Sequence, residues 1–228
     1  MCGGMTALCR RVGLMTRILA YDHVMGFYND HVLPRVTNVL LGNKAFGELR
    51  REVCEGLEGD VVELGFGSGL NLPWLPSTVT GVWAVEPSGT ATKLATKRIA
   101  SAKVAVHVAG LDGAHMDLPD DKFDSALSTM TLCTIPDVSS ALEQLRRVLK
   151  PGGSFHFAEH GHSPDQKIAR TQDRFNGFQQ RWAGGCHLNR DIAGLITGAG
   201  FEIEHLRNFY LKGPKAWGYM YTGRAKSG

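Results

Sequence analysis

The segment Val61-Val62-Glu63-Leu64-Gly65-Phe66-Gly67-Ser68-Gly69 joins a short apolar run to three closely spaced glycines. Residues 60–64 predict a buried β-strand that ends directly at the first glycine. Because glycine has no Cβ, such a loop lets a ligand approach the backbone closely. Glu63 precedes the first glycine by two positions. A carboxylate at this point suits a positively charged ligand better than a pyrophosphate.

After the glycines, short apolar runs alternate with segments of helical periodicity. We expect strands over residues 81–85, 103–108, 123–129 and 154–159. We expect helices after Ser88, over residues 137–149 and after Asn189, with Ser88 and Asn189 as N-caps and a capping box formed by Ser140 and Glu143. Residues 201–210 and 216–222 predict a final antiparallel strand pair. The chain is therefore expected to be an α/β protein with a Rossmann-like, doubly wound, mainly parallel sheet.

The first part of the chain has a different pattern. Pro34 is expected to interrupt a helical segment, and apolar residues between Val36 and Leu57 recur at three- and four-residue steps, which predicts one buried helix face. We expect residues 1–58 to be an N-terminal helical extension or lid, part of the same domain as residues 59–228. Ligands in such folds bind outside the carboxyl ends of the strands.

Composition excludes several classes of protein. The formal charge of +3 and the lack of long Lys/Arg runs argue against a nucleic-acid partner. Five scattered cysteines form no CxxC pair, which argues against a zinc ribbon or a disulfide framework and favours a reducing cytoplasm. We expect neither a signal peptide nor a transmembrane segment, although peripheral contact with a membrane stays open.

An acidic residue, Glu86, ends the second expected strand about 20 residues after the glycine loop. At this position a carboxylate accepts hydrogen bonds from ribose hydroxyls. The order of strand, ExGxGxG loop, second strand and terminal glutamate is much more specific than a glycine triplet alone.

Residues 60–160 resemble class I S-adenosylmethionine-dependent methyltransferases. The resemblance implies that the cofactor is S-adenosylmethionine, whose methionine end lies at the ExGxGxG loop and whose ribose is held by the acid after the second strand. It implies a loop after the third strand that contacts adenine. The implied cofactor-binding residues are Glu63, Gly65, Gly67, Gly69, Glu86, Asp112, Gly113, Ala114 and Thr129.

A closer resemblance covers roughly residues 35–224. The segments Thr131-Leu132-Cys133-Thr134-Ile135 and Gly185-Cys186-His187-Leu188 are similar to the thiol methyltransferase-like family and its bacterial relatives. The resemblance implies a small or lipophilic acceptor with a thiol, amine or hydroxyl nucleophile. The nucleophile class and the oligomeric state stay open.

Methyl transfer from a sulfonium is an in-line displacement, so a general base is optional. His160, after the fifth expected strand, is our first candidate base, and His187 is the second. A histidine that only hydrogen-bonds a loop is an equal alternative for His160. Tyr21 and Tyr28 could contact the cofactor or the acceptor, or pack in the core.

We expect no metal site. Strand alternation places His156 and His160 on one face and Glu159 on the other, so these side chains should not converge on one ion. Cys133 and Cys186 are expected to be small core residues. Phe175, Phe178 and Trp182 recur at helical steps and could line an acceptor pocket, touch lipid, or pack on the sheet.

Two alternatives come from other classes. A nicotinamide-dependent oxidoreductase would also use Glu86, but Leu70 stands where GxGxxG needs glycine, and the chain has no Tyr-x-x-x-Lys pair. A non-catalytic cofactor-binding module would bind the cofactor without turnover.

Overall fold

The computed structural model describes residues 25–110 and 112–228. Their seven strands form one sheet in the order β3-β2-β1-β4-β5-β7-β6. The strands are β1 (Gly59–Leu64), β2 (Val79–Val85), β3 (Ala105–Gly110), β4 (Phe123–Thr129), β5 (Leu149–His160), β6 (Phe201–Tyr210) and β7 (Tyr219–Ser227). Neighbouring strands from β3 to β5 are parallel, whereas β7 is antiparallel to both β5 and β6. The predicted Rossmann-like sheet with an antiparallel C-terminal pair is confirmed.

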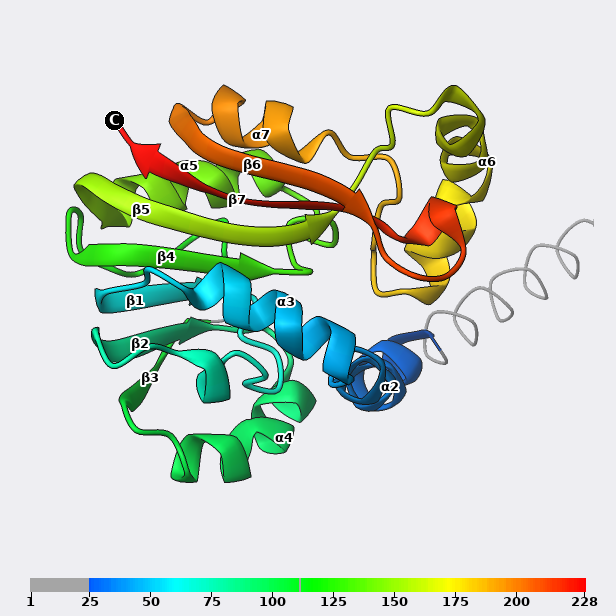
Figure 1. Cartoon of the computed structure of the whole chain (residues 1–228). Coiled ribbons are helices and arrows are strands. Elements are labelled where there is room, and N and C mark those ends of the chain that lie inside the picture. The colour runs from blue at the N-terminus through cyan, green and yellow to red at the C-terminus, as the bar shows by residue number, and fades with distance from the viewer. Residues whose placement is uncertain (1–24, 111) are drawn as a thin grey trace, which may run out of the picture.

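Helices cover both faces of the sheet (Figure 1). Alternate residues of β1 point to opposite faces: Val61 belongs to the core under α3 (Lys44–Cys54) and α4 (Gly89–Ala100), and Val62 to the core under α5 (Val138–Val148) and α7 (Ile192–Gly198). Successive side chains of a strand point to opposite faces, and because helices cover both faces of this sheet, Val61 and Val62 are both fully buried.

The N-terminal part differs from the single buried helix face that we expected. A π-helical turn η1 (Tyr28–Val32) leads into α2 (Leu33–Leu40), and Pro34 lies in the first turn of α2, where its missing N–H costs no hydrogen bond. The chain then breaks before Asn43, whose side chain accepts hydrogen bonds from the N–H groups of Ala45 and Phe46 and starts α3. Val39 is 72% exposed, so part of the periodic face is not buried.

Some local boundaries also differ. Ser88 caps α4 as expected, but Asp191 rather than Asn189 caps α7, and Asp137 rather than Ser140 caps α5. We expected the last strand over residues 216–222, but residues Lys215–Trp217 form a 3-10 turn, η3. The strand β7 begins after this turn and pairs with β6 from Tyr219 to Ser227. These differences leave the order of strands unchanged.

The remaining described elements are η2 (Leu72–Trp74) and α6 (Gln166–Trp182). In Figure 1, α2 and α6 both lie beyond the carboxyl ends of the parallel strands. Among the described residues, no helix is both long enough and apolar enough to cross a bilayer.

Candidate active site

The glycine loop leaves β1 with three residues in the left-handed region. The φ angle is +75° at Gly65, +57° at Gly67 and +74° at Gly69. A Cβ on Gly65 would lie 2.1 Å from the Thr131 hydroxyl oxygen, so glycine there lets the loop pack on the segment after β4. A Cβ on Gly67 would meet only the Gly65 carbonyl oxygen, at 3.9 Å, within 4 Å. At Gly67 the backbone therefore faces open space.

Glu86, directly after β2, is linked to this loop. Its Oε2 accepts a hydrogen bond from the Gly67 N–H at 2.7 Å, and its Oε1 accepts one from the Ser88 N–H at 2.8 Å. Burial raises the pKa of Glu86 above its ordinary value, although both hydrogen bonds oppose this shift. Each carboxylate oxygen keeps a second lone pair for another donor.

Glu63 is buried beside the loop with incomplete hydrogen bonding. Its Oε1 accepts a hydrogen bond from Asn71 Nδ2 at 2.7 Å, whereas its Oε2 has no partner among the described residues. The Asn71 Oδ1 and Arg50 Nε atoms are also buried and unpaired within that part of the chain. Burial raises the pKa of Glu63 to about 8, against the Asn71 hydrogen bond and the Arg50 charge. Buried polar atoms without partners are rare and point to a missing ligand or water.

A cavity of about 710 Å³ opens at the carboxyl ends of β1, β2 and β4. Six predicted cofactor residues line it: Gly65, Gly67, Glu86, Asp112, Gly113 and Thr129. The Thr129 hydroxyl accepts a hydrogen bond from Asn71 Nδ2 at 3.0 Å. Three other predicted residues do not line the cavity. Glu63 lies buried behind Asn71, Gly69 packs on Phe66 and Leu72, and Ala114 donates its N–H to Asp112 Oδ1 at 2.9 Å.

The N-terminal helices also reach this cavity, through residues that the sequence pattern did not single out. Thr37, Leu41 and Arg50 contribute to its wall. The Ser68 hydroxyl of the glycine loop donates a hydrogen bond to Asn38 Oδ1 at 2.7 Å. No local signal could have found these residues, because the contact joins segments that are 30 positions apart in the chain.

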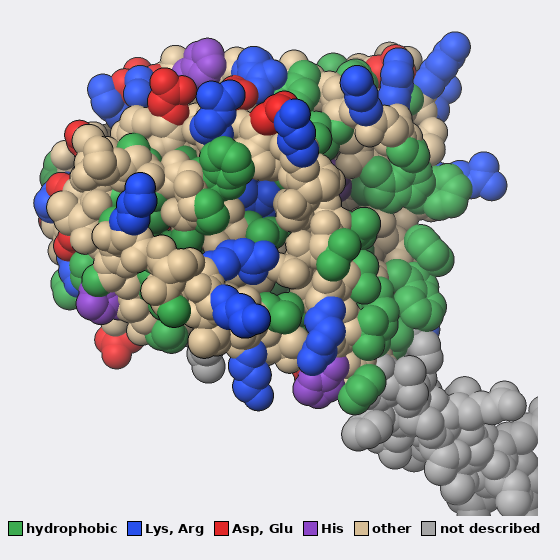
Figure 2. Space-filling model, turned by 60° about the horizontal axis from the view of Figure 1, so that its bottom comes forward, with side chains coloured by type: hydrophobic (Ala, Val, Ile, Leu, Met, Phe, Trp, Pro, Cys, Tyr) green, Lys and Arg blue, Asp and Glu red, His purple; other side chains and the backbone are tan. Residues whose placement is uncertain are grey.

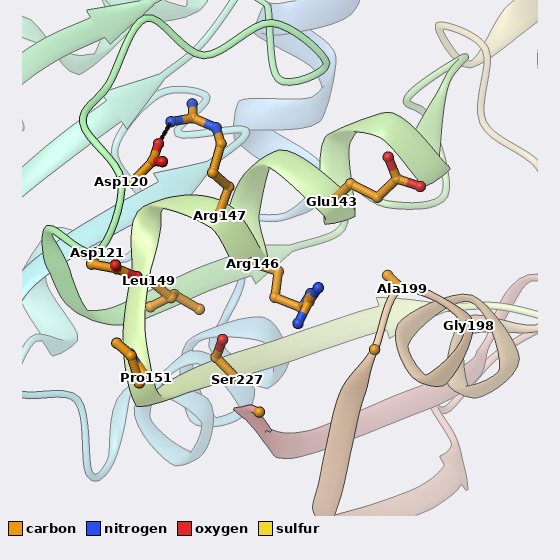
Figure 3. A pocket seen from close by; sticks show the side chains of 12 residues that line it. Asp120, Asp121, Glu143, Arg146, Arg147, Leu149, Pro151, Gly198, Ala199 and Ser227 are labelled. Atoms are coloured by element: carbon orange, nitrogen blue, oxygen red, sulfur yellow. Dashed lines mark hydrogen bonds and ion pairs between the residues drawn. The ribbon is translucent and has the colours of Figure 1, made fainter.

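A different cavity, of about 670 Å³, lies beside α5, α7 and the end of β7 (Figure 3). Its Arg147 is paired with Asp120 and also donates hydrogen bonds to the carbonyl oxygens of Leu118 and Met116. Arg147 therefore holds the loop before β4 in place. None of the predicted site residues lines this cavity.

His160, the last residue of β5, is 2% exposed and does not line the larger cavity. Its ring nitrogens lie 3.8 Å and 3.9 Å from the Cys186 sulfur, and the Cys186 and Cys133 sulfurs are 3.5 Å apart. Burial alone would lower the pKa of His160, but contact with Cys186 outweighs it and raises the pKa. The hydrogen bond with Cys133, helped by His160, lowers the pKa of Cys186.

Cys133 and Cys186 are buried, as we expected of small core residues, but the structure also brings them into contact with each other. They lie 53 positions apart in the sequence but touch in the fold, with His160 beside them. From the sequence, a metal site at His160 was considered only with residues of the same strand, His156 and Glu159, and not with the distant cysteines. The one signal in the sequence was that Cys133 and Cys186 both lie in the two segments that resemble the thiol methyltransferase-like family.

His187 lies elsewhere. Its ring Nδ1 lies 3.0 Å from Gln180 Nε2. Its backbone N–H donates a hydrogen bond to the Cys133 carbonyl oxygen at 2.7 Å. Because an amide nitrogen only donates, Nδ1 accepts, and the proton of the neutral ring lies on Nε2. Burial and the Arg190 charge lower the pKa of His187. In this arrangement Nδ1, the ring nitrogen that could take a proton, already accepts a hydrogen bond.

Tyr28 does not line the cavity; its hydroxyl donates a hydrogen bond to the Trp182 carbonyl oxygen at 3.1 Å. This bond ties the N-terminal region to the end of α6. Tyr21 lies outside the described residues.

Comparison with known proteins agrees with this geometry. A family model described as a methyltransferase domain matches residues 62–157. Thiol S-methyltransferase TMT1B of Homo sapiens is 30% identical over 175 residues, which cover 71% of this chain and 71% of that protein. TMT1B of Rattus norvegicus is 29% identical over 155 residues, and the match spans only 62% of its length.

Solved methyltransferases share the fold. Geranyl diphosphate methyltransferase in complex with S-adenosylmethionine superposes with a TM-score of 0.62 at 10% identity, over 81% of this chain and 85% of that chain. Phosphoethanolamine N-methyltransferase 2 of Haemonchus contortus gives a TM-score of 0.62 at 18% identity, over 81% of this chain and 46% of that chain. At these identities the likeness concerns the fold alone. Together, the sequence matches show that the chain belongs to the class I S-adenosylmethionine-dependent methyltransferases, in the family that includes the thiol S-methyltransferases TMT1A and TMT1B.

Proposed function

We propose that the protein transfers the methyl group of S-adenosylmethionine to the sulfur of a small lipophilic thiol. The cofactor is that of the family. The observation that carries the proposal is the open backbone at Gly67 beside the carboxylate of Glu86, together with the unpaired buried oxygen of Glu63 in β1. The thiol acceptor is inferred from the relatives named thiol S-methyltransferases.

These residues fit the polar groups of the cofactor. The buried Glu63 carboxylate suits the ammonium of the methionine end, because a buried carboxylate is stabilised strongly by a nearby positive charge. Glu86 has free lone pairs for the ribose hydroxyls. Asp112 and Gly113 would border the adenine. The bound cofactor supplies an activated methyl group, and the protein has to position the acceptor and exclude water.

The N-terminal region would complete the site as part of the same domain. The hydrogen bond between Asn38 and Ser68 and the place of Thr37 and Leu41 in the cavity wall support this role. The Tyr28 hydroxyl bond to Trp182 would hold the region against α6.

A lipophilic acceptor is supported by an apolar surface beside the site. Figure 2 shows hydrophobic side chains gathered at one end of the molecule, with Lys and Arg side chains at the borders of this group and over the rest of that face. The ring of Phe175 lies 5.7 Å from that of Trp217, and the ring of Phe178 lies 6.3 Å from that of Trp182. All four side chains are between 39% and 62% exposed. Such a surface would hold the alkyl part of an acceptor, or rest on a membrane that contains it.

Transfer to sulfur requires a thiolate, which then attacks the methyl carbon in line with the leaving sulfur. His160 remains our candidate base for an acceptor that reaches the end of β5, and His187 is the weaker candidate because its Nδ1 already accepts a hydrogen bond from Gln180. An amine or hydroxyl acceptor stays an alternative.

Calorimetry with S-adenosylhomocysteine tests the cofactor, and turnover tests the acceptor. The panel holds an alkyl thiol, a phenol, an amine lipid and a heterocycle. We expect binding, and formation of S-adenosylhomocysteine fastest with the thiol. Faster turnover of another acceptor would replace the thiol in this proposal. Binding of a nicotinamide cofactor without S-adenosylhomocysteine would overturn it.

A further inference from the structure

Three soft or borderline metal ligands converge beside the cavity. Cys133, His160 and Cys186 each offer one ligand atom, and these atoms all lie within 4.8 Å of one another. The three residues come from different segments: the loop after β4, the end of β5 and the loop after α6. All three are buried. We propose that they bind one Zn²⁺ ion and leave its fourth position to the thiol of the acceptor.

Two of the three distances between ligand atoms match a tetrahedral ion, and the third, between Cys133 and His160, is at most 4.8 Å. Zinc–sulfur bonds of about 2.3 Å and zinc–nitrogen bonds of about 2.0–2.1 Å at tetrahedral angles place neighbouring ligand atoms about 3.6–3.8 Å apart. The Cys186 and Cys133 sulfurs are 3.5 Å apart, and the His160 nitrogens are 3.8 Å and 3.9 Å from the Cys186 sulfur. Thiolate and imidazole ligands favour zinc over magnesium or calcium.

The backbone around the ligands is fixed by hydrogen bonds. The Glu159 carboxylate accepts the Thr131 N–H at 2.8 Å, and the Cys133 carbonyl oxygen accepts the His187 N–H at 2.7 Å. The Cys186 N–H donates to the Ala183 carbonyl oxygen at 3.1 Å. These hydrogen bonds hold the backbone of the three segments around the ligand atoms. Two thiolates also balance the charge of Zn²⁺, which suits a buried site.

The cluster lies directly behind the cavity wall. Thr134 and Gly185, each next to one of the two cysteines, line the cavity. Their segments touch, since a Cβ on Gly185 would lie 3.2 Å from the Thr134 carbonyl oxygen. A site with three protein ligands and an open position is typical of catalytic rather than structural zinc.

Binding at the fourth position would activate the acceptor, and this part rests on the proposed function. With His160 bound to the ion, the ion replaces it as the group that activates the thiol, and the acceptor thiol would release its proton to solvent as its sulfur binds the ion. A sulfur lone pair would then form the bond to the methyl carbon while the sulfonium carbon–sulfur bond breaks. The bond electrons remain on the sulfur of S-adenosylhomocysteine, and the neutral thioether leaves the ion.

Cobalt titration of the whole chain tests the site. Cys2 and Cys9 are replaced by serine in every sample, and a phosphine keeps the remaining thiols reduced. We expect one Co²⁺ per chain, with the visible bands of tetrahedral cobalt bound to sulfur, and its displacement by Zn²⁺. Cys133→Ser, Cys186→Ser and His160→Asn should each weaken binding at least 10-fold. Cys54→Ser, which removes a buried thiol elsewhere, should not.

S-adenosylhomocysteine calorimetry on each variant separates loss of a ligand from loss of the fold. Addition of propanethiol to the cobalt protein should shift the bands, whereas propanol should not. No stoichiometric cobalt in the reduced protein, or undiminished binding by folded Cys186→Ser, overturns the metal site. A bound metal that ignores propanethiol overturns the role of the fourth position. If the protein with all three ligand residues in place does not bind S-adenosylhomocysteine, this result counts against the proposed function alone.

Discussion

The Glu86 carboxylate accepts a hydrogen bond from the backbone N–H of Gly67 at 2.7 Å and thereby joins the end of β2 to the loop after β1. The same side chain accepts the N–H of Ser88, the N-cap of α4. One half-buried carboxylate thus fixes two of the segments between which the cofactor would lie. The arrangement gives separate tests for the loop and for the acid.

Gly67→Ala should weaken S-adenosylhomocysteine binding at least 10-fold, about 1.4 kcal/mol. The added Cβ would occupy the open space beside the Gly67 backbone, where the cofactor would contact the loop. Gly152→Ala is a matched control, because Gly152 has φ +75° and nothing within 4 Å of its Cβ position, but lies at the irregularity of β5 between its paired residues Leu149 and Ser154. Both variants should lose about 1–2 kcal/mol of stability from the left-handed backbone. Equal affinities in the two variants would show that the cofactor does not contact Gly67.

Glu86→Gln should lower cofactor affinity by about 10–100-fold, since a hydrogen bond to a charged group contributes about 1.5–3 kcal/mol. The amide keeps one acceptor oxygen, so the loop should still fold. Calorimetry with S-adenosylhomocysteine measures the loss, and Glu202→Gln, on the exposed side of β6, serves as control. Wild-type affinity in Glu86→Gln would remove this residue from the cofactor site.

Glu63→Gln should stabilise the protein without cofactor. The pKa of Glu63 rises from 4.5 to about 8 on folding because the side chain is buried. The folded chain therefore holds a proton that the unfolded chain loses, so wild-type stability falls as pH rises from 4.5 towards 8. Removing the acid should recover up to about 3 kcal/mol at pH 7 and little at pH 4. Denaturant unfolding at both pH values measures the difference, and an equal gain at both would contradict the raised pKa.

The same carboxyl group should release a proton when the cofactor binds. Without cofactor Glu63 is mostly protonated at pH 7, and a nearby ammonium would favour the carboxylate. Binding enthalpies in two buffers with different ionisation heats should reveal a release approaching one proton in the wild type. Glu63→Gln should release none. Release that is unchanged in this variant would mean that the ammonium lies elsewhere.

Phe178→Ser should reduce kcat/KM for a long-chain alkyl thiol several-fold and leave ethanethiol unaffected. The Phe178 side chain is 62% exposed, so its loss should remove contact with an alkyl chain rather than core packing. Val108→Ser, at an equally exposed position on β3, is the control. A parallel loss with both thiols would indicate that α6 acts on the fold instead of on the acceptor chain.

The sequence predicted the sheet well because the strands carry strong local signals. β1 and β2 contain short apolar runs, and the C-terminal pair is separated by a Lys-Gly-Pro-Lys turn. Helix boundaries were less secure. Asn43 divides the expected N-terminal helix, and Asp191 caps α7 in place of Asn189, because competing polar residues stand within a few positions of each other.

By itself, the sequence determined the fold class, the glycine loop and the two acids next to it, since each depends on residues close together in the chain. Only the tertiary structure decided which distant groups meet. It brings Asn38 to Ser68, and it joins Cys133, His160 and Cys186 into one cluster. The cysteine and histidine side chains meet because the ends of β4 and β5 and the loop after α6 pack together at the carboxyl edge of the sheet. Residue spacing carries no signal for them, because the packing of whole elements sets those distances.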